Sequence, residues 1–239
     1  LEAGTTTLEK TRNITGLEWQ KDDSWGGFVI TRVSDYPTEV NLEDALVYSD
    51  NIYFAQEALD MGAEVFLDGL SKFPFGEEFE LPISMQPAQI SNSGSLESES
   101  LLADTAFGQG QLLMSPIQQA VFYGAFANQG EIVYPTLELN NESGKSVQAI
   151  SPETADIVKE LLVQVVENPA GTANVLNNSG SKLAAKTGTA EYQSPDTADK
   201  LDINGFLVAF DAEEDSFLSL ILVEDISGSD VAVQFSPLF

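Results

Sequence analysis

Neither cysteine nor histidine occurs among the 239 residues of this sequence. The absence of cysteine excludes disulfide bonds, thiol catalysis and zinc sites built from thiolates. The absence of histidine excludes a Ser-His-Asp triad and most transition-metal sites. Any serine chemistry in this chain therefore needs a different base, and lysine and tyrosine are the residue types that remain.

Basic residues are scarce, since 10 lysines and arginines stand against 38 aspartates and glutamates, for a net charge of −28. A surface of this sign repels nucleic acid and anionic lipid, so we expect no nucleic-acid partner. The acidity indicates a strongly solvated surface. Calcium binding is the alternative, but the acidic runs Glu77-Glu78 and Asp211 to Asp215 lack the alternating oxygen ligands of an EF-hand loop.

Long apolar runs are also missing, which argues against a membrane-spanning segment within these residues. No secretory leader is apparent, and Leu1 is not a natural start residue. We therefore expect the sequence to be a piece of a longer protein.

The sequence does contain a helical middle followed by strands. Loops and short strands are expected before residue 35. Capping residues followed by apolar residues at helical spacing predict helices over 41–48, 52–62, 64–72, 98–106, 115–130 and 151–166. Strands are predicted over 183–191, 203–210 and 217–223, and a last helix over 231–239. Short links between the strands favour an antiparallel sheet, so the fold class is α+β, with a helical part at about 41–166 and a sheet part at about 183–223.

Two short motifs carry the chemistry. The run from Lys186 to Thr189, Lys-Thr-Gly-Thr, lies on a predicted strand, where the lysine and the threonine hydroxyls can hold a substrate carboxylate. Gly188 lets a substrate approach the backbone, whose N–H groups can pair with an extended peptide or stabilise an oxyanion. Between two predicted helices, Ser49 could pass a proton between Lys186 and a reacting group, and Asn51 could donate its amide to a substrate carbonyl.

Each motif alone has an ordinary structural interpretation. A Lys-Thr-Gly run occurs often by chance, and Ser49-Asp50-Asn51 is typical of a helix cap or turn. The Gly108-Gln109-Gly110 run is most simply a tight turn, because no Gly-Lys-Ser/Thr follows to make a phosphate loop. The two motifs gain weight only together, in this order and context.

Longer runs resemble the transpeptidase domain of class B penicillin-binding proteins, with most similarity to the low-affinity, β-lactam-resistant type of Gram-positive bacteria. The resemblance extends from Leu1 to about Val223. It rests on Trp19-Gln20-Lys21-Asp22, Ser24-Trp25-Gly26-Gly27, Thr31-Arg32-Val33, Ser49 to Gln56, Ala88 to Asn92, Leu101 to Asp104, Gly108-Gln109-Gly110, Pro116 to Gln119, Gly171-Thr172-Ala173 and Lys186 to Glu191.

The resemblance implies a role for each motif residue. Lys186 would help to fix the substrate carboxylate, Thr187 and Thr189 would bind it through their hydroxyls, and the N–H of Thr189 would form half of the oxyanion hole. Ser49 would transfer a proton to the leaving nitrogen, and Asn51 would hold the amide side of the substrate. No metal or organic cofactor is implied.

The same resemblance implies a partial domain over residues 1–239, with three strands of the five-stranded antiparallel sheet of the penicillin-binding-protein and serine β-lactamase fold. The nucleophile of the family lies on a Ser-x-x-Lys helix. We expect this motif to be absent, with no serine followed three residues later by lysine, so that these residues alone are inactive. A core without its central helix should also expose a large apolar cavity.

The leading hypothesis is therefore a fragment of a D,D-transpeptidase that cross-links peptidoglycan. Its partners would be stem peptides ending in D-Ala-D-Ala, β-lactam antibiotics and the cell-wall synthesis machinery. The implied location is the outer face of the cytoplasmic membrane, with an anchoring helix that these residues do not include. A β-lactamase or β-lactam sensor, and a non-catalytic module that binds peptidoglycan or β-lactams, remain as alternatives.

Overall fold

The computed structural model describes residues 1–137, 144–192, 201–214, 216–226 and 228–239. Short antiparallel strand pairs open the chain: β1 (Arg12–Asn13) pairs with β4 (Glu39–Val40), and β2 (Glu18–Trp19) pairs with β3 (Ile30–Thr31). The short 3-10 helix η1 (Asp23–Trp25) lies between β2 and β3. Trp25 is buried there and contacts Trp19 and Phe28 edge-on or tilted, so that aromatic packing anchors this small region.

Six helices make up the middle of the chain as described. They are α1 (Leu42–Val47), α2 (Asn51–Met61), α3 (Ala63–Leu70), α4 (Glu99–Thr105), α5 (Pro116–Ala127) and α6 (Pro152–Glu167). Their starts follow the capping signals of the sequence. Asn41 and Ser115 each form a capping box, and Ser151 caps α6 with proline at its first helical position. A hairpin of β5 (Glu131–Val133) and β6 (Ser146–Gln148) separates α5 from α6.

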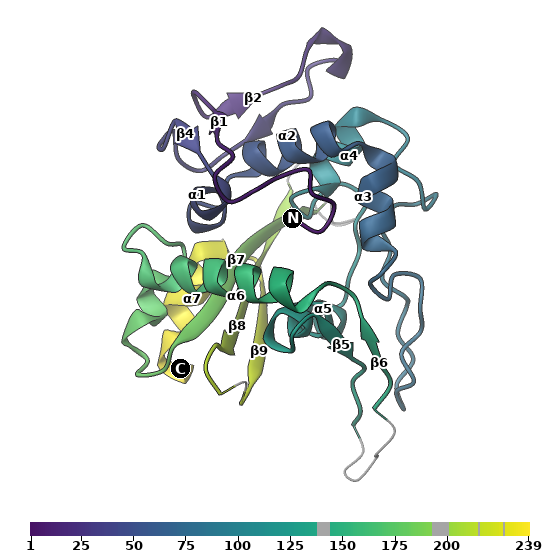
Figure 1. Cartoon of the computed structure of the whole chain (residues 1–239), viewed down its shortest axis with the longest axis vertical. Coiled ribbons are helices and arrows are strands. Elements are labelled where there is room, and N and C mark those ends of the chain that lie inside the picture. Colours follow the sequence, from purple (N-terminus) through teal and green to yellow (C-terminus); the bar gives the residue numbers. More distant parts are fainter. Residues whose placement is uncertain (138–143, 193–200, 215, 227) are drawn as a thin grey trace.

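A three-stranded antiparallel sheet follows in the order β7 (Leu183–Tyr192), β8 (Asp202–Asp211) and β9 (Leu218–Glu224). The short helix η2 (Asn174–Asn178) precedes the sheet. Figure 1 shows the sheet in the lower half of the molecule, with the N-terminal strands and α2 to α4 above it. The α+β prediction with an antiparallel sheet of three strands is therefore confirmed.

Alternate residues of the strands pack on opposite faces of the sheet, as the pleat requires. Ala185 and Leu207 join a buried cluster with Val231 of α7 (Gly228–Phe235). Ala184 and Phe210 join another with Leu162 of α6. The last helix was predicted over 231–239, but α7 begins at Gly228 and ends at Phe235, and the 3-10 helix η3 (Ser236–Leu238) follows it. Within the described ranges no helix is both long and apolar enough to cross a membrane.

Candidate active site

Ser49 occupies a strained turn between two helices. The N–H of Ser49 donates to the carbonyl of Leu46 at 3.3 Å, and the N–H of Asp50 donates to that of Ala45 at 2.8 Å. This pair of bonds is the Schellman arrangement that closes a helix C-terminus, and it places residue 49 in the left-handed region, with φ of 54°. Glycine is the usual residue at that place. The backbone thus holds Ser49 in a conformation that serine rarely adopts.

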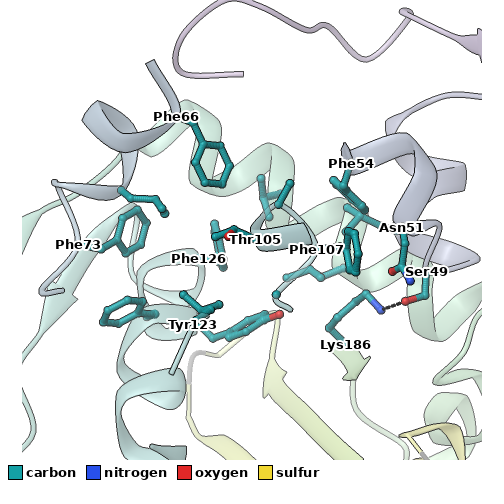
Figure 2. Close-up of a pocket in the computed structure, with 18 of the residues that line it drawn as sticks. Ser49, Asn51, Phe54, Phe66, Phe73, Thr105, Phe107, Tyr123, Phe126 and Lys186 are labelled. Atoms are coloured by element: carbon teal, nitrogen blue, oxygen red, sulfur yellow. Dashed lines mark hydrogen bonds between the residues drawn. The ribbon is translucent and has the colours of Figure 1, made fainter. Parts of the chain in front are cut away.

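The side chain of Lys186 reaches across to this turn from β7. Its Nζ donates to Ser49 Oγ at 2.8 Å and to the carbonyl of Thr187 at 2.8 Å, and Figure 2 shows the first of these bonds. Across the described residues, no carboxylate lies within ion-pair distance of this ammonium group. Burial without such a partner lowers the pKa of Lys186 from 10.5 to about 8. The pair Ser49–Lys186 is therefore suited to moving a proton near neutral pH.

Asn51 lies beside Ser49 at the start of α2. Its Nδ2 donates to the carbonyl of Thr31 at 3.0 Å, so one of its two amide hydrogens is engaged within the protein. The second hydrogen and the carbonyl oxygen of this half-buried side chain have no described protein partner. The role predicted for Asn51 at a substrate amide stays a prediction. One of the two hydrogens on its amide nitrogen is left to donate to a substrate.

The two threonines of the β7 motif differ in their surroundings. Thr187 is buried, and its hydroxyl donates to Thr172 Oγ1 at 2.8 Å. Thr189 is exposed, and its carbonyl accepts a hydrogen bond from Gln109 Nε2 at 3.0 Å. Gly188 lies between them, and a Cβ added there would make only ordinary contact with Phe206. The strand thus presents Thr189 outward, whereas the Thr187 hydroxyl is hydrogen-bonded to Thr172 inside the protein.

A cavity of about 540 Å³ begins at these polar groups and continues between the helices. Ser49, Asn51 and Lys186 line one end of it. Aromatic rings from α3 to α5 line the other end, and Figure 2 shows them facing Lys186 across the cavity. They include Phe66, Phe73, Tyr123 and Phe126. Burial raises the pKa of the Tyr123 hydroxyl to about 12, so Tyr123 stays protonated at neutral pH. A largely apolar cavity therefore lies next to the motif residues.

Two residues of the site lie outside the two short motifs. Gln109 holds the Thr189 carbonyl. Thr172 connects β7 to the end of α1, because its hydroxyl accepts from Thr187 and its N–H donates to the Val47 carbonyl at 3.3 Å. Both lie in runs that carried the family resemblance. Each forms contacts with residues far away in sequence, which local patterns do not reveal.

The expectation that no serine has a lysine three residues later is wrong, because Ser179 and Lys182 have this spacing. They lie in a turn after η2 rather than on a helix. The Ser179 hydroxyl donates to the Ser181 carbonyl at 3.2 Å, and Lys182 Nζ lies 3.3 Å from Glu160. Lys182 precedes Lys186 by four strand residues, or about 13 Å. The turn therefore does not supply a nucleophile to the cavity.

Comparisons with known proteins identify relatives of this chain. Residues 1–234 match the family described as penicillin binding protein transpeptidase domain. Penicillin-binding protein 3 of Bacillus subtilis is 41% identical over 230 residues, which cover 95% of this chain and 34% of the relative. Peptidoglycan D,D-transpeptidase MrdA of Salmonella typhimurium is 26% identical over 223 residues, covering 80% of this chain and 36% of the relative.

Among solved structures, the transpeptidase domain of Burkholderia pseudomallei penicillin-binding protein 3 superposes with a TM-score of 0.82. It shares 20% sequence identity, and the match covers 99% of this chain and 74% of that chain, so this similarity concerns the fold. The chain spans about a third of the length of both curated relatives.

Proposed function

Because the chain belongs to the family of penicillin-binding protein transpeptidase domains, we propose that it forms part of a D,D-transpeptidase that cross-links peptidoglycan. The substrate would be a stem peptide ending in D-Ala-D-Ala, and β-lactams would acylate the same site. The hydrogen bond between Lys186 Nζ and Ser49 Oγ at the mouth of the cavity is the observation that supports this function best. It joins two motifs that are 137 residues apart in the sequence.

The reaction is an acyl transfer in two steps. A serine hydroxyl attacks the carbonyl carbon between the two D-alanines, an ester forms, and D-alanine leaves with the proton that its nitrogen needs. An amine of a second strand then attacks the ester and releases the serine. We assign proton transfer to Ser49 and Lys186, and binding of the substrate to Asn51, Gly188 and Thr189. Thr187 would join them only if its hydroxyl turned away from Thr172.

The attacking hydroxyl would come from outside these 239 residues. Ser49 accepts the Lys186 hydrogen bond in a turn, and Ser179 lies away from the cavity. We therefore propose that residues 1–239 are part of a transpeptidase domain and are inactive alone. The longer protein would work without metal or organic cofactor at the outer face of the cytoplasmic membrane, with the wall-synthesis machinery. We also propose that it is of the low-affinity Gram-positive type.

Labelled penicillin and intact-protein mass spectrometry test the proposal. We expect one adduct on the protein encoded by the whole gene and none on the 239-residue chain. In the whole protein, Lys186→Ala should slow acylation strongly, whereas the matched control Lys182→Ala should not. An adduct on the isolated chain would refute the assignment of the nucleophile, and a whole protein that stays unmodified at saturating drug would refute the transpeptidase. Rapid release of hydrolysed drug would indicate a β-lactamase instead. A lasting adduct on a protein that does not cross-link peptidoglycan would indicate a β-lactam sensor.

A further inference from the structure

Arg32 is buried in the N-terminal region with almost all of its donors in use. It is one of two arginines in the sequence, and 5% of its surface is exposed. Its Nε donates to the Gly16 carbonyl at 2.9 Å, and its Nη2 donates to the Ile14 carbonyl at 3.1 Å. Its Nη1 donates to the Pro37 carbonyl at 3.0 Å and to Asp50 Oδ2 at 2.9 Å. A buried guanidinium group needs this degree of satisfaction, so the surrounding backbone is arranged around it.

Asp50, the buried partner of Arg32, ends one helix and begins the next. Its Oδ1 accepts the N–H groups of Ile52 at 2.9 Å and Tyr53 at 3.1 Å, which caps α2. Its own N–H donates to the Ala45 carbonyl and completes the turn after α1. Since Oδ2 is held by Arg32, the position of this carboxylate is fixed from three sides.

Thr31 and Arg32 thus hold two consecutive residues of the run Ser49-Asp50-Asn51, which we call the motif loop. Arg32 binds Asp50, and the carbonyl of Thr31 accepts from Asn51. Both contacts fall directly after Ser49. We propose that Arg32 and Asp50 are positioning residues, whose ion pair holds the loop so that Ser49 Oγ meets Lys186 Nζ. The catalytic meaning of this inference rests on the proposed function, whereas the geometry can be tested without it.

The strain at Ser49 explains why such a clamp is needed. A serine at positive φ returns to an extended or right-handed conformation unless its neighbours prevent it. A rotation there would swing the hydroxyl away from Lys186. The bonds of Asp50 to Arg32 and to the first turn of α2 oppose that rotation directly, because Asp50 is the next residue along the chain.

The other arginine supplies a matched control. Arg12 Nε donates to Glu57 at 2.5 Å, and Arg12 Nη2 donates to Asp60 at 2.6 Å. These contacts connect the same N-terminal region to the body of α2, but they do not touch the motif loop. If Arg32 served stability alone, replacing either arginine would change the pKa of Lys186 to the same extent.

Carbon-13 labelling of lysine side chains allows the pKa of Lys186 to be measured by NMR, with its signal assigned from the Lys186→Met variant. Loss of a hydrogen bond to the ammonium form lowers a lysine pKa, so Ser49→Ala should lower it. Arg32→Lys keeps the charge and loses the planar fork. We expect Arg32→Lys to lower the pKa of Lys186, as Ser49→Ala does. The double variant should show no further shift beyond that of Ser49→Ala, and Arg12→Lys should cause no shift.

A folded Arg32→Lys variant with an unchanged Lys186 pKa would overturn the inference. So would a shift that persists undiminished with alanine at position 49, because the effect would then bypass Ser49. If Arg32→Lys fails to fold, Arg32→Met combined with Asp50→Asn removes both charges together, keeps the cap acceptor, and should give the same shift. No drug or substrate enters this experiment, so a negative result leaves the transpeptidase proposal intact, and failed acylation would leave the positioning role standing.

Discussion

Replacing Lys186 by methionine should abolish a rise in stability that the unmodified chain shows between about pH 8 and pH 10.5. Burial lowers the pKa of this lysine in the folded state from 10.5 to about 8. In that window the unfolded chain binds the proton and the folded chain does not, so stability increases with pH. Each pKa unit corresponds to about 1.4 kcal/mol, which gives an upper value of about 3 kcal/mol, reduced because the side chain is only partly buried. Below the folded-state pKa, where the lysine is charged, the variant also lacks the bonds to Ser49 and to the Thr187 carbonyl, which stabilise the unmodified chain by ~1–2 kcal/mol.

Urea unfolding followed by tryptophan fluorescence at fixed salt, from pH 7 to pH 10, measures the difference between the two proteins. The free energy of unfolding of Lys186→Met, minus that of the unmodified chain, should fall steadily as the pH rises. Lys182→Met is the control, because the ion pair of Lys182 with Glu160 is exposed and its removal should not reproduce the trend. A constant difference across the range would refute the conclusion that Lys186 is held as a poorly compensated buried cation.

Three further changes test the surroundings of the site. Gly171→Ala should destabilise the fold by about 3 kcal/mol or more in urea unfolding, because the new Cβ would lie far inside contact distance of the Val165 carbonyl. Gly124→Ala is the control: open space surrounds this position, so the change should be neutral or stabilising. Ser49→Gly should be more stable than Ser49→Ala by about 1 kcal/mol, since both lose the hydroxyl and only glycine relaxes the positive φ; equal stabilities would contradict the strain. Asp211→Asn should lower stability at pH 7, and this loss should shrink as the pH falls below the usual titration range of aspartate. Hydrogen bonds from a serine hydroxyl and backbone N–H groups lower the pKa of this carboxyl, so its contribution disappears on protonation; a pH-independent loss would argue against that cause.

The elements that the sequence predicted are those whose causes are local. A capping serine followed by proline predicts the start of α5 and α6, and apolar β-forming runs predict β7 to β9. The sequence also suggested proton exchange between Ser49 and Lys186, because the two motifs belong together in one family. The contacts that complete the site could not be predicted in this way. Gln109 and Thr189 lie 80 residues apart, and only the packed fold brings them together.

The pair Ser179 and Lys182 shows that a motif spacing does not by itself make a site. Its spacing satisfies the pattern of a nucleophile motif, yet it lies in a turn whose polar groups bind one another and Glu160. A spacing pattern contains no information about whether a helix presents it or a cavity receives it. Its chemical meaning therefore depends on the surrounding structure.

The left-handed turn at residue 49 restricts which amino acids evolution can place there. Threonine offers the same hydroxyl as serine, but its branched Cβ makes positive φ far more costly. Glycine and asparagine fit the backbone but lack the hydroxyl that meets Lys186. Serine combines a tolerable backbone with a hydroxyl that can both accept and donate a proton, so this position should vary less than its chemistry by itself demands.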